Sequence, residues 1–235
     1  MTGYTGITAE SLFLLAENRF QDSKGFYEEH KPAIWAGVVE PLRALVGELA
    51  PTMLAIDQKM IVDPLKNGCV SRVRRDNRYT NDKAMYRENM WIAFLRDKRA
   101  WDYTLPAFFL DFSIRGAEWG LGFYSTTADI MRTLRRIAEL DPDRVTAALR
   151  RAKRAGFDLC GTPYARRRST DDIPPPLRPL YDCRNVSLVR EESADFVASA
   201  DLPERLITGF KALAPIYEIM MQAVELNGQG DGIHG

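Results

Sequence analysis

The order of apolar and polar positions predicts helices at the beginning of the chain. Between Ala9 and Asn18, apolar residues recur at the spacing of one helical face, which predicts a short amphipathic helix. A second region, from Ile34 to Ala50, keeps a period of three to four residues and is punctuated by Pro32 and Pro41. This region predicts a helix that turns one face toward a core.

The period then changes to two, which indicates strands. Short aromatic and β-branched runs, separated by charged or glycine-containing turns, occupy residues 70–75, 90–95, 107–114 and 119–124. In the third run, Phe108 and Leu110 alternate with Phe109 and Asp111, so one mostly apolar face is expected to meet a core. The Arg115-Gly116 pair suits a hairpin connection. We therefore expect an antiparallel sheet.

The second half of the chain predicts further helices with recognisable ends. Thr126 and Asp141 are placed to begin two helices, and Gly156 is placed to end the second of them in a left-handed conformation. A last helix is expected from Asp201, with Pro215 kinking or splitting it. Two short strands and a long irregular connection are expected at residues 157–160, 186–189 and 161–179.

These elements together predict an α+β fold. We expect a central, mostly antiparallel β-sheet on which N-terminal, middle and C-terminal helices pack. The chain has 235 residues, of which 46% are hydrophobic, enough for a sizeable core. Because no repeat or long linker is apparent, we expect a single domain over residues 1–227. Residues 228–235 are rich in glycine and are expected to form a disordered tail.

The overall charge narrows the range of partners. Thirty-two basic and thirty-two acidic residues give a formal net charge of zero, so no global field attracts nucleic acid, and nucleic acid is not an expected partner. No apolar stretch is long enough to span a bilayer, and the first residues do not have the pattern of a signal peptide. A cytoplasmic location without membrane association is therefore expected.

The number and spacing of cysteines and histidines limit the kinds of metal site and catalytic site that the chain can form. The three cysteines, Cys69, Cys160 and Cys183, are odd in number and widely spaced, which favours reduced thiols over a disulfide framework or a paired zinc site. Of the two histidines, His234 falls in the expected tail, which leaves His30 alone. A histidine-cluster metal site is thus excluded, a histidine-dependent triad is not expected, and no cofactor motif is present.

One segment, from Arg72 to Arg87, concentrates positive charge. Six basic residues and two acidic residues within sixteen positions give it a formal charge of +4. Arginine presents a planar fork of donors that matches pairs of phosphate or carboxylate oxygens, and Lys83 adds a point charge. If Arg72 to Asp76 forms a strand and residues 78–83 a turn, such a cluster can seat a phosphate.

The same segment carries a family resemblance, through Arg72, Arg75, Asp76, Arg78, Tyr79, Thr80, Asp82, Lys83 and Tyr86. At these positions the sequence resembles the signature of the bacterial family of uncharacterised proteins called domain of unknown function 2461. Two further stretches, 108–124 and 210–215, are similar to an aromatic and glycine-rich strand pair and to a C-terminal helix of that family. The resemblance implies an α+β domain and no particular reaction.

Two hypotheses follow for the motif. In the leading one it binds or processes a small anionic, phosphorylated ligand through Arg72, Arg75, Arg78, Lys83 and Tyr86. Asp76 and Asp82 would organise the cations and, if the protein is an enzyme, act as general acid or base. In the alternative, the motif is an internal salt-bridge network of a non-catalytic interaction or structural protein. Whether the protein is an enzyme, and its oligomeric state, stay open at this point.

A third hypothesis for the motif is a metal-dependent nuclease. Two-metal phosphodiester hydrolysis uses paired acidic residues near a lysine. Asp82 and Lys83 are adjacent, so on an extended strand they would point to opposite faces, and no carboxylate-x-Lys triplet accompanies Asp76 or Asp82. This pattern disfavours a nuclease.

Overall fold

The computed structural model describes residues 3–65, 68–76, 78, 81–96 and 104–230, and it forms two compact units. The first unit comprises Met1–Phe94, Phe109–Trp119 and Glu191–Ile207; the second comprises Leu95–Phe108, Gly120–Arg190 and Thr208–Gly235. Helices combine with one five-stranded sheet, so the expected α+β class is confirmed. The expectation of a single domain stays a prediction.

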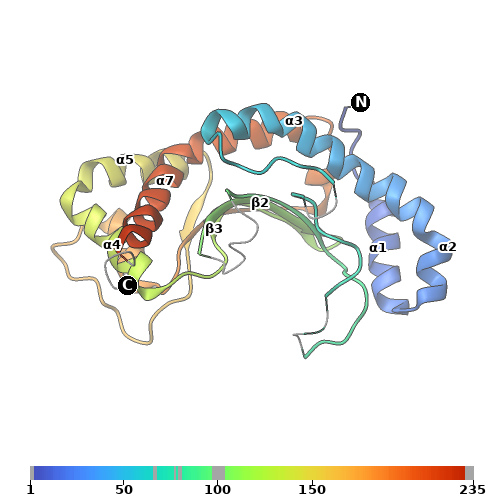
Figure 1. Cartoon of the computed structure of the whole chain (residues 1–235), viewed down its shortest axis with the longest axis horizontal. Helices are drawn as coiled ribbons and strands as arrows, with labels where there is room; N and C mark the ends of the chain where they lie inside the picture. The colour runs from blue at the N-terminus through green and yellow to red at the C-terminus, as the bar shows by residue number, and fades with distance from the viewer. Residues whose placement is uncertain (1–2, 66–67, 77, 79–80, 97–103, 231–235) are drawn as a thin grey trace. The chain divides into compact units, whose positions relative to one another are not determined.

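The sheet has the strand order β1-β2-β3-β5-β4, and Figure 1 labels its strands β2 and β3. Three of the expected strand runs become β1, β2 and β3, and the two short C-terminal runs become β4 and β5, which pair antiparallel with Leu159 opposite Leu188. The bounds are β1 Met90–Phe94, β2 Pro106–Ser113, β3 Gly116–Phe123, β4 Asp158–Cys160 and β5 Ser187–Glu192.

The run at residues 70–75 does not form a strand. It makes two isolated antiparallel bridges, Val70 to Ile92 and Arg74 to Tyr86. Arg72 and Arg74 are exposed while Val73 is buried, so the alternation that suggested a strand is real but too short to support a continuous ladder. The strand part of the predicted strand and turn motif is therefore corrected to an extended loop.

The first unit carries the N-terminal helices α1 Ala9–Gln21, α2 Lys24–Ile34, the π-helix η1 Trp35–Val39, and α3 Glu40–Ile56. The Thr8 hydroxyl caps α1 by accepting the Ser11 amide at 3.3 Å. Pro41 has no N–H to donate to the carbonyl of Gly37, and the Glu40 amide instead donates to Trp35 O, five residues back. A proline thus accompanies a π-helical turn, and residues 24–56 form one uninterrupted helical run.

The second unit carries α4 Ala128–Leu140, α5 Pro142–Arg154, α6 Arg178–Asp182 and most of α7 Leu202–Gly230. Thr127, not Thr126, caps α4 by accepting the Ile130 amide at 3.2 Å, whereas Asp141 caps α5 as expected, accepting the Arg144 amide at 3.1 Å. Gly156 has φ +90°, the predicted left-handed ending. Pro215 lies inside α7 without splitting it, and residues 231–235 of the expected tail lie outside the described residues.

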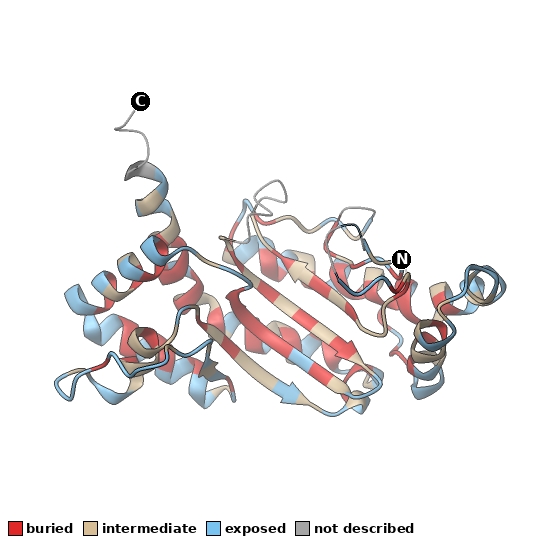
Figure 2. Ribbon diagram, turned by 90° about the horizontal axis from the view of Figure 1, so that it is seen from below, coloured by how far each residue is buried: buried red, intermediate tan, exposed pale blue. Residues whose placement is uncertain are grey.

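Each unit buries aromatic side chains contributed by the central strands. In the first, Trp119 of β3 stacks on Phe196 of the short helix η3 Ala194–Ala198, with ring centroids 5.6 Å apart. In the second, Phe108 of β2 packs against Phe210 and Tyr217 of α7. Figure 2 shows buried and half-buried positions alternating along β1 and β2, as the period of two requires.

Within the described ranges, no helix combines the length and the apolar character needed to cross a bilayer.

The glycines of β3 allow close packing of the sheet, and one of them gives a testable consequence. A Cβ atom at Gly120 would lie 1.9 Å from the carbonyl oxygen of Leu188 in β5, whereas a Cβ atom at Gly47 in α3 would meet nothing within 4 Å. We expect Gly120→Ala to lower the free energy of unfolding by about 1–3 kcal/mol. Gly47→Ala should raise it by about 0.5–1 kcal/mol because alanine loses less backbone entropy in a helix.

Denaturant titration of both variants measures the two changes. Equal effects of the two substitutions would contradict the close approach of β3 and β5.

Candidate functional site

The arginine-rich segment is held as a closed loop by backbone hydrogen bonds. The Arg75 amide donates to Met85 O at 2.8 Å, and the Arg87 amide donates to Val73 O at 2.9 Å. Just before the loop, the Ser71 amide donates to Trp91 O of β1 at 2.9 Å. The two ends of the loop are thus fixed beside each other and beside the sheet.

Asp22, at the end of α1, anchors the far side of this loop. It adopts a left-handed conformation with φ +42°, which asparagine and aspartate tolerate better than most residues. Its carboxylate oxygen Oδ1 accepts the amides of Met85 at 2.8 Å and Tyr86 at 3.2 Å. A single carboxylate therefore connects the N-terminal helices to the arginine-rich segment.

Tyr86 packs beneath the loop rather than on its surface. Its side chain is 2% exposed, and its ring stacks on Tyr27 of α2 with centroids 4.8 Å apart. Burial raises the pKa of the Tyr86 hydroxyl above its usual value. Tyr86 therefore joins the loop to α2 through its ring, while its backbone forms a bridge with that of Arg74.

Asp82 is the centre of one ionic cluster. Its Oδ2 forms ion pairs with Arg75 and, at 3.3 Å, with Arg19 of α1, while its Oδ1 accepts the Ala84 amide at 3.0 Å. The Ala84 hydrogen bond, followed by the one from Arg75, lowers the pKa of the carboxyl group. Asp82 is therefore ionised at neutral pH and holds two guanidinium groups together.

Asp76 is the centre of a second cluster. It forms a two-point contact with Arg78, through Nε to Oδ1 at 2.9 Å and Nη2 to Oδ2 at 2.7 Å, and it accepts the Arg78 amide at 3.3 Å. The side chain of Arg78 and then its amide lower the pKa of Asp76 to about 2, with a smaller contribution from Arg72. The Asp82 cluster thus joins one carboxylate to two arginines, whereas the Asp76 cluster is a two-point pair with Arg78.

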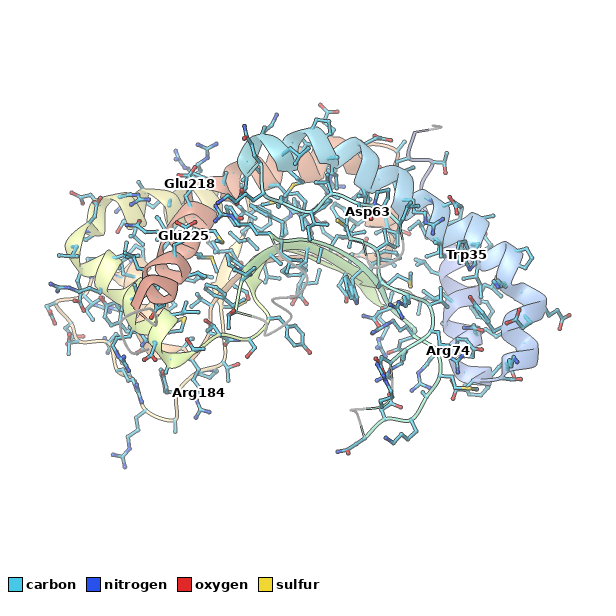
Figure 3. All side chains as sticks on the ribbon, viewed as in Figure 1. Trp35, Asp63, Arg74, Arg184, Glu218 and Glu225 are labelled. Carbon is cyan, nitrogen blue, oxygen red and sulfur yellow. The ribbon has the colours of Figure 1, made fainter. Side chains whose placement is uncertain are left out.

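The structure brings most of the predicted site residues onto this loop. Arg75 meets Asp82, Arg78 meets Asp76, and Lys83 is exposed next to Asp82 in the chain. Figure 3 labels Arg74 on the stretch of chain that faces α1 and α2. Tyr79 and Thr80 lie outside the described residues.

Three residues that the sequence did not single out belong to the site or border it. Arg19 and Asp22 come from α1, about sixty positions before their partners, so only the folded chain reveals them. The third is Asp111 of β2, which accepts Asn89 Nδ2 at 2.8 Å. The available signal was a single carboxylate within the apolar run of β2.

Asp111 is the carboxyl group of this region whose pKa moves upward. Burial raises its pKa to about 6, and the nearby charge of Glu118 adds to the effect, while Asn89 and Arg87 oppose it. Arg87, the last residue of the arginine-rich segment, therefore lies close enough to Asp111 to lower its pKa. A carboxyl group with this pKa can take up or release a proton near neutral pH.

Among the described residues, no three side chains of histidine, cysteine, aspartate or glutamate gather to hold a metal ion. Arginine, lysine and the backbone amides dominate the loop, and these groups donate hydrogen bonds to anions. The donor set therefore suits an anion rather than a cation.

Comparison with known proteins gives one finding. The sequence model of the family described as "Conserved hypothetical protein (DUF2461)" matches residues 10–218. No curated protein matches the chain.

The anchoring role of Asp22 can be tested by two substitutions. Asp22→Ala removes the acceptor for two amides and places alanine at a left-handed position, so we expect a loss of about 1–2 kcal/mol in the free energy of unfolding. Asp22→Asn keeps an oxygen acceptor and tolerates the conformation, so it should retain most of the stability. Chemical denaturation compares them, and an equal loss in both would contradict this role.

The raised pKa of Asp111 predicts a pH-dependent stability. Because the folded-state pKa exceeds the unfolded value, the contribution of Asp111 is full below pH 4 and is lost as pH rises to about 6. The free energy of unfolding of the protein should therefore fall relative to that of Asp111→Asn across this window. A carbon-detected NMR titration should give a midpoint near pH 6, and a midpoint near 4 would refute the burial argument.

Proposed function

Since the chain belongs to the family of conserved hypothetical proteins (DUF2461), whose description names no reaction, we propose from the loop itself that the protein binds a small anionic, phosphorylated ligand. The ligand would be held by Arg72, Arg75, Arg78 and Lys83, with Asp76 and Asp82 orienting the arginines. The observation that carries the proposal is that two exposed carboxylates of one closed loop orient guanidinium groups, Asp82 those of Arg75 and Arg19, and Asp76 that of Arg78.

The charge balance of the loop supports anion binding. Residues 72–87 have a formal charge of +4, and the contributions of Arg19 and Asp22 cancel each other. Asp76 and Asp82 each accept a hydrogen bond from a backbone amide of the loop in addition to pairing with arginine. Their two negative charges are already counted in the total of +4. A phosphate dianion would therefore enter a region with excess positive charge.

The exposure of the ion pairs allows a ligand to compete for the arginines. The Arg78 and Asp76 side chains are 72% and 53% exposed, and the Asp82 side chain is 47% exposed. Exposed ion pairs contribute little to stability because water and salt screen them. Arg78 can therefore turn part of its donor fork to phosphate oxygens without a large cost, whereas the Arg75 side chain is 21% exposed and presents a smaller part of its fork.

The same geometry favours binding over catalysis by the two aspartates. A carboxylate whose pKa is about 2, such as Asp76, is a weak base near neutral pH. If the bound ligand is also processed, the pKa of Asp111, about 6, suits proton transfer better than that of Asp76.

A second candidate is a non-catalytic interaction or structural protein in which this loop is an internal salt-bridge network. The specific observation in its favour is that Arg75 and Arg78 already have carboxylate partners. In that case the loop would stabilise the fold and leave ligands unaffected.

The two candidates can be separated by thermal unfolding with a panel of pyrophosphate, nucleotides and sugar phosphates. Binding to the folded state adds about 2.7 kcal/mol at a ligand concentration one hundred times Kd, which raises the Tm. We expect Arg75→Ala and Arg78→Ala each to reduce the rise. The matched control is Arg132→Ala, which removes an arginine that is 74% exposed and paired with Asp129 within α4, and which should leave the rise unchanged.

Three outcomes count against the proposal. No ligand of the panel raises the Tm of the unmodified protein; the rise is undiminished in both loop variants; or Arg132→Ala reduces it equally. A loss of stability in Arg75→Ala and Arg78→Ala without ligand, together with an unresponsive parent protein, would support the internal network instead.

A further inference from the structure

A second set of arginines gathers around Tyr164 in the second unit. The guanidinium carbons of Arg168, Arg184 and Arg135 lie 3.5, 5.6 and 5.9 Å from the centroid of the Tyr164 ring. Aromatic rings attract cations through their negative faces, so one ring can hold several guanidinium groups near one another. Three positive charges therefore converge on a single side chain.

The backbone around this cluster is fixed by hydrogen bonds between two segments. The Tyr164 amide donates to Asp182 O at 2.8 Å, and the Arg184 amide donates to Thr162 O at 2.7 Å. Pro163 and Cys183 form a bridge between these segments. The positions of Tyr164 and Arg184 thus follow from a paired backbone rather than from a free loop.

Asp182, whose backbone carbonyl accepts the Tyr164 amide, also has a side chain that accepts hydrogen bonds from backbone amides. Its Oδ1 accepts the amides of Arg168 and Ser169, each at 2.8 Å, and its Oδ2 accepts the Ser169 hydroxyl at 2.8 Å. The hydrogen bond from the Ser169 amide is the largest cause of the lowered pKa of Asp182. Against three arginines, one carboxylate leaves two positive charges uncompensated.

The guanidinium groups themselves differ in what they contact. Arg135 donates to the carbonyl oxygens of Leu180 at 2.8 Å and Cys183 at 3.0 Å, so it is a structural member of the cluster. Arg168 and Arg184 are exposed, and within the described part of the chain neither forms an ion pair with a carboxylate. Figure 3 shows Arg184 projecting outward from its segment.

The other charged residues of this segment do not provide a carboxylate partner for Arg168 or Arg184 among the described residues. Arg167 pairs with Asp171 at 3.0 Å and donates to Ser169 at 2.9 Å, so this pair is neutral. Asp172 is exposed, and the Thr170 hydroxyl lowers the pKa of its carboxyl group. The remaining arginine of the segment, Arg166, is exposed and makes no cation–π contact with Tyr164 among the described residues.

We propose that Arg168 and Arg184, held in place on the Tyr164 ring and backed by Arg135, form a binding site for a phosphate group. Guanidinium groups recognise phosphate through paired hydrogen bonds, and groups fixed beforehand lose less freedom on binding. The phosphate belongs either to a small phosphorylated molecule or to the backbone of a single-stranded nucleic acid, whose chemistry at the arginines is the same. The site does not rest on the function proposed for the Arg72 to Arg87 loop.

Isothermal titration with pyrophosphate at low salt tests the site in the full-length protein. We expect Arg168→Ala and Arg184→Ala each to weaken binding about tenfold, the loss of one charge-assisted contact. Tyr164→Leu keeps all the charges but removes the ring that positions them, so it should also weaken binding. The matched control, Arg166→Ala, removes one exposed charge from the same segment and should leave the affinity nearly unchanged.

Arg75→Ala, in the other arginine-rich loop, separates the two sites. If Arg75→Ala weakens pyrophosphate binding while Arg168→Ala and Arg184→Ala leave the affinity unchanged, the Tyr164 site is refuted and the other loop is supported. Equal weakening by Arg166→Ala, or no heat from pyrophosphate in any protein, also refutes the site.

A second titration uses a short single-stranded oligonucleotide to identify the source of the phosphate. Binding tighter than that of pyrophosphate, with the same dependence on Arg168 and Arg184, assigns the site to nucleic acid. Binding of pyrophosphate alone assigns it to a small ligand. Circular dichroism of each variant ensures that a lost affinity is not a lost fold.

Discussion

Much of this structure depends on one constraint: backbone amides outside helices and sheets need acceptors, and aspartates supply them. Asp22 accepts the amides of Met85 and Tyr86, Asp82 that of Ala84, and Asp182 those of Arg168 and Ser169. In each case the carboxylate holds a loop in place, and arginines lie on the loops so held, paired with Asp82 in one and around Tyr164 in the other. The chain has a formal net charge of zero, yet it contains two arginine-rich segments whose carboxylates accept hydrogen bonds from backbone amides.

The two arginine clusters use different means to hold guanidinium groups. On the Arg72 to Arg87 loop, Arg75 and Arg78 are oriented by carboxylates, so their charges are partly compensated. Around Tyr164, an aromatic ring orients Arg168 and Arg184 without compensating their charge. A ligand must compete with an aspartate at the first cluster and meets no such competitor among the described neighbours of Arg168 and Arg184. Cation–π support thus preserves more of the positive potential than ion pairing does.

The sequence was informative where a local pattern determines structure. The alternation of Phe108 and Leu110 with Phe109 and Asp111 identified β2, and Asp141 and Gly156 marked both ends of α5. The sequence was less informative where contacts between segments distant in the chain determine the structure. Residues 70–75 have a strand-like alternation but lack enough pairing partners, and Arg19, Asp22 and Tyr27 reach the motif through tertiary structure. Burial of Asp111 depends on neighbours that no local pattern specifies.

The π-helical turn at Trp35–Val39 has a consequence for how this family can vary in length. A π-helical turn contains one more residue than an α-helical turn, and each residue rotates a helix by roughly 100°. Deleting one residue within Trp35–Val39 would therefore remove the extra residue and restore an α-helical turn, with little rotation of α2 about the axis of α3. Deleting one residue elsewhere in α2 or α3 would rotate α2, and α1 packed on it, by roughly 100° and would carry Arg19 and Asp22 away from the loop that they contact. Changes of length within this helical run should therefore be confined to Trp35–Val39.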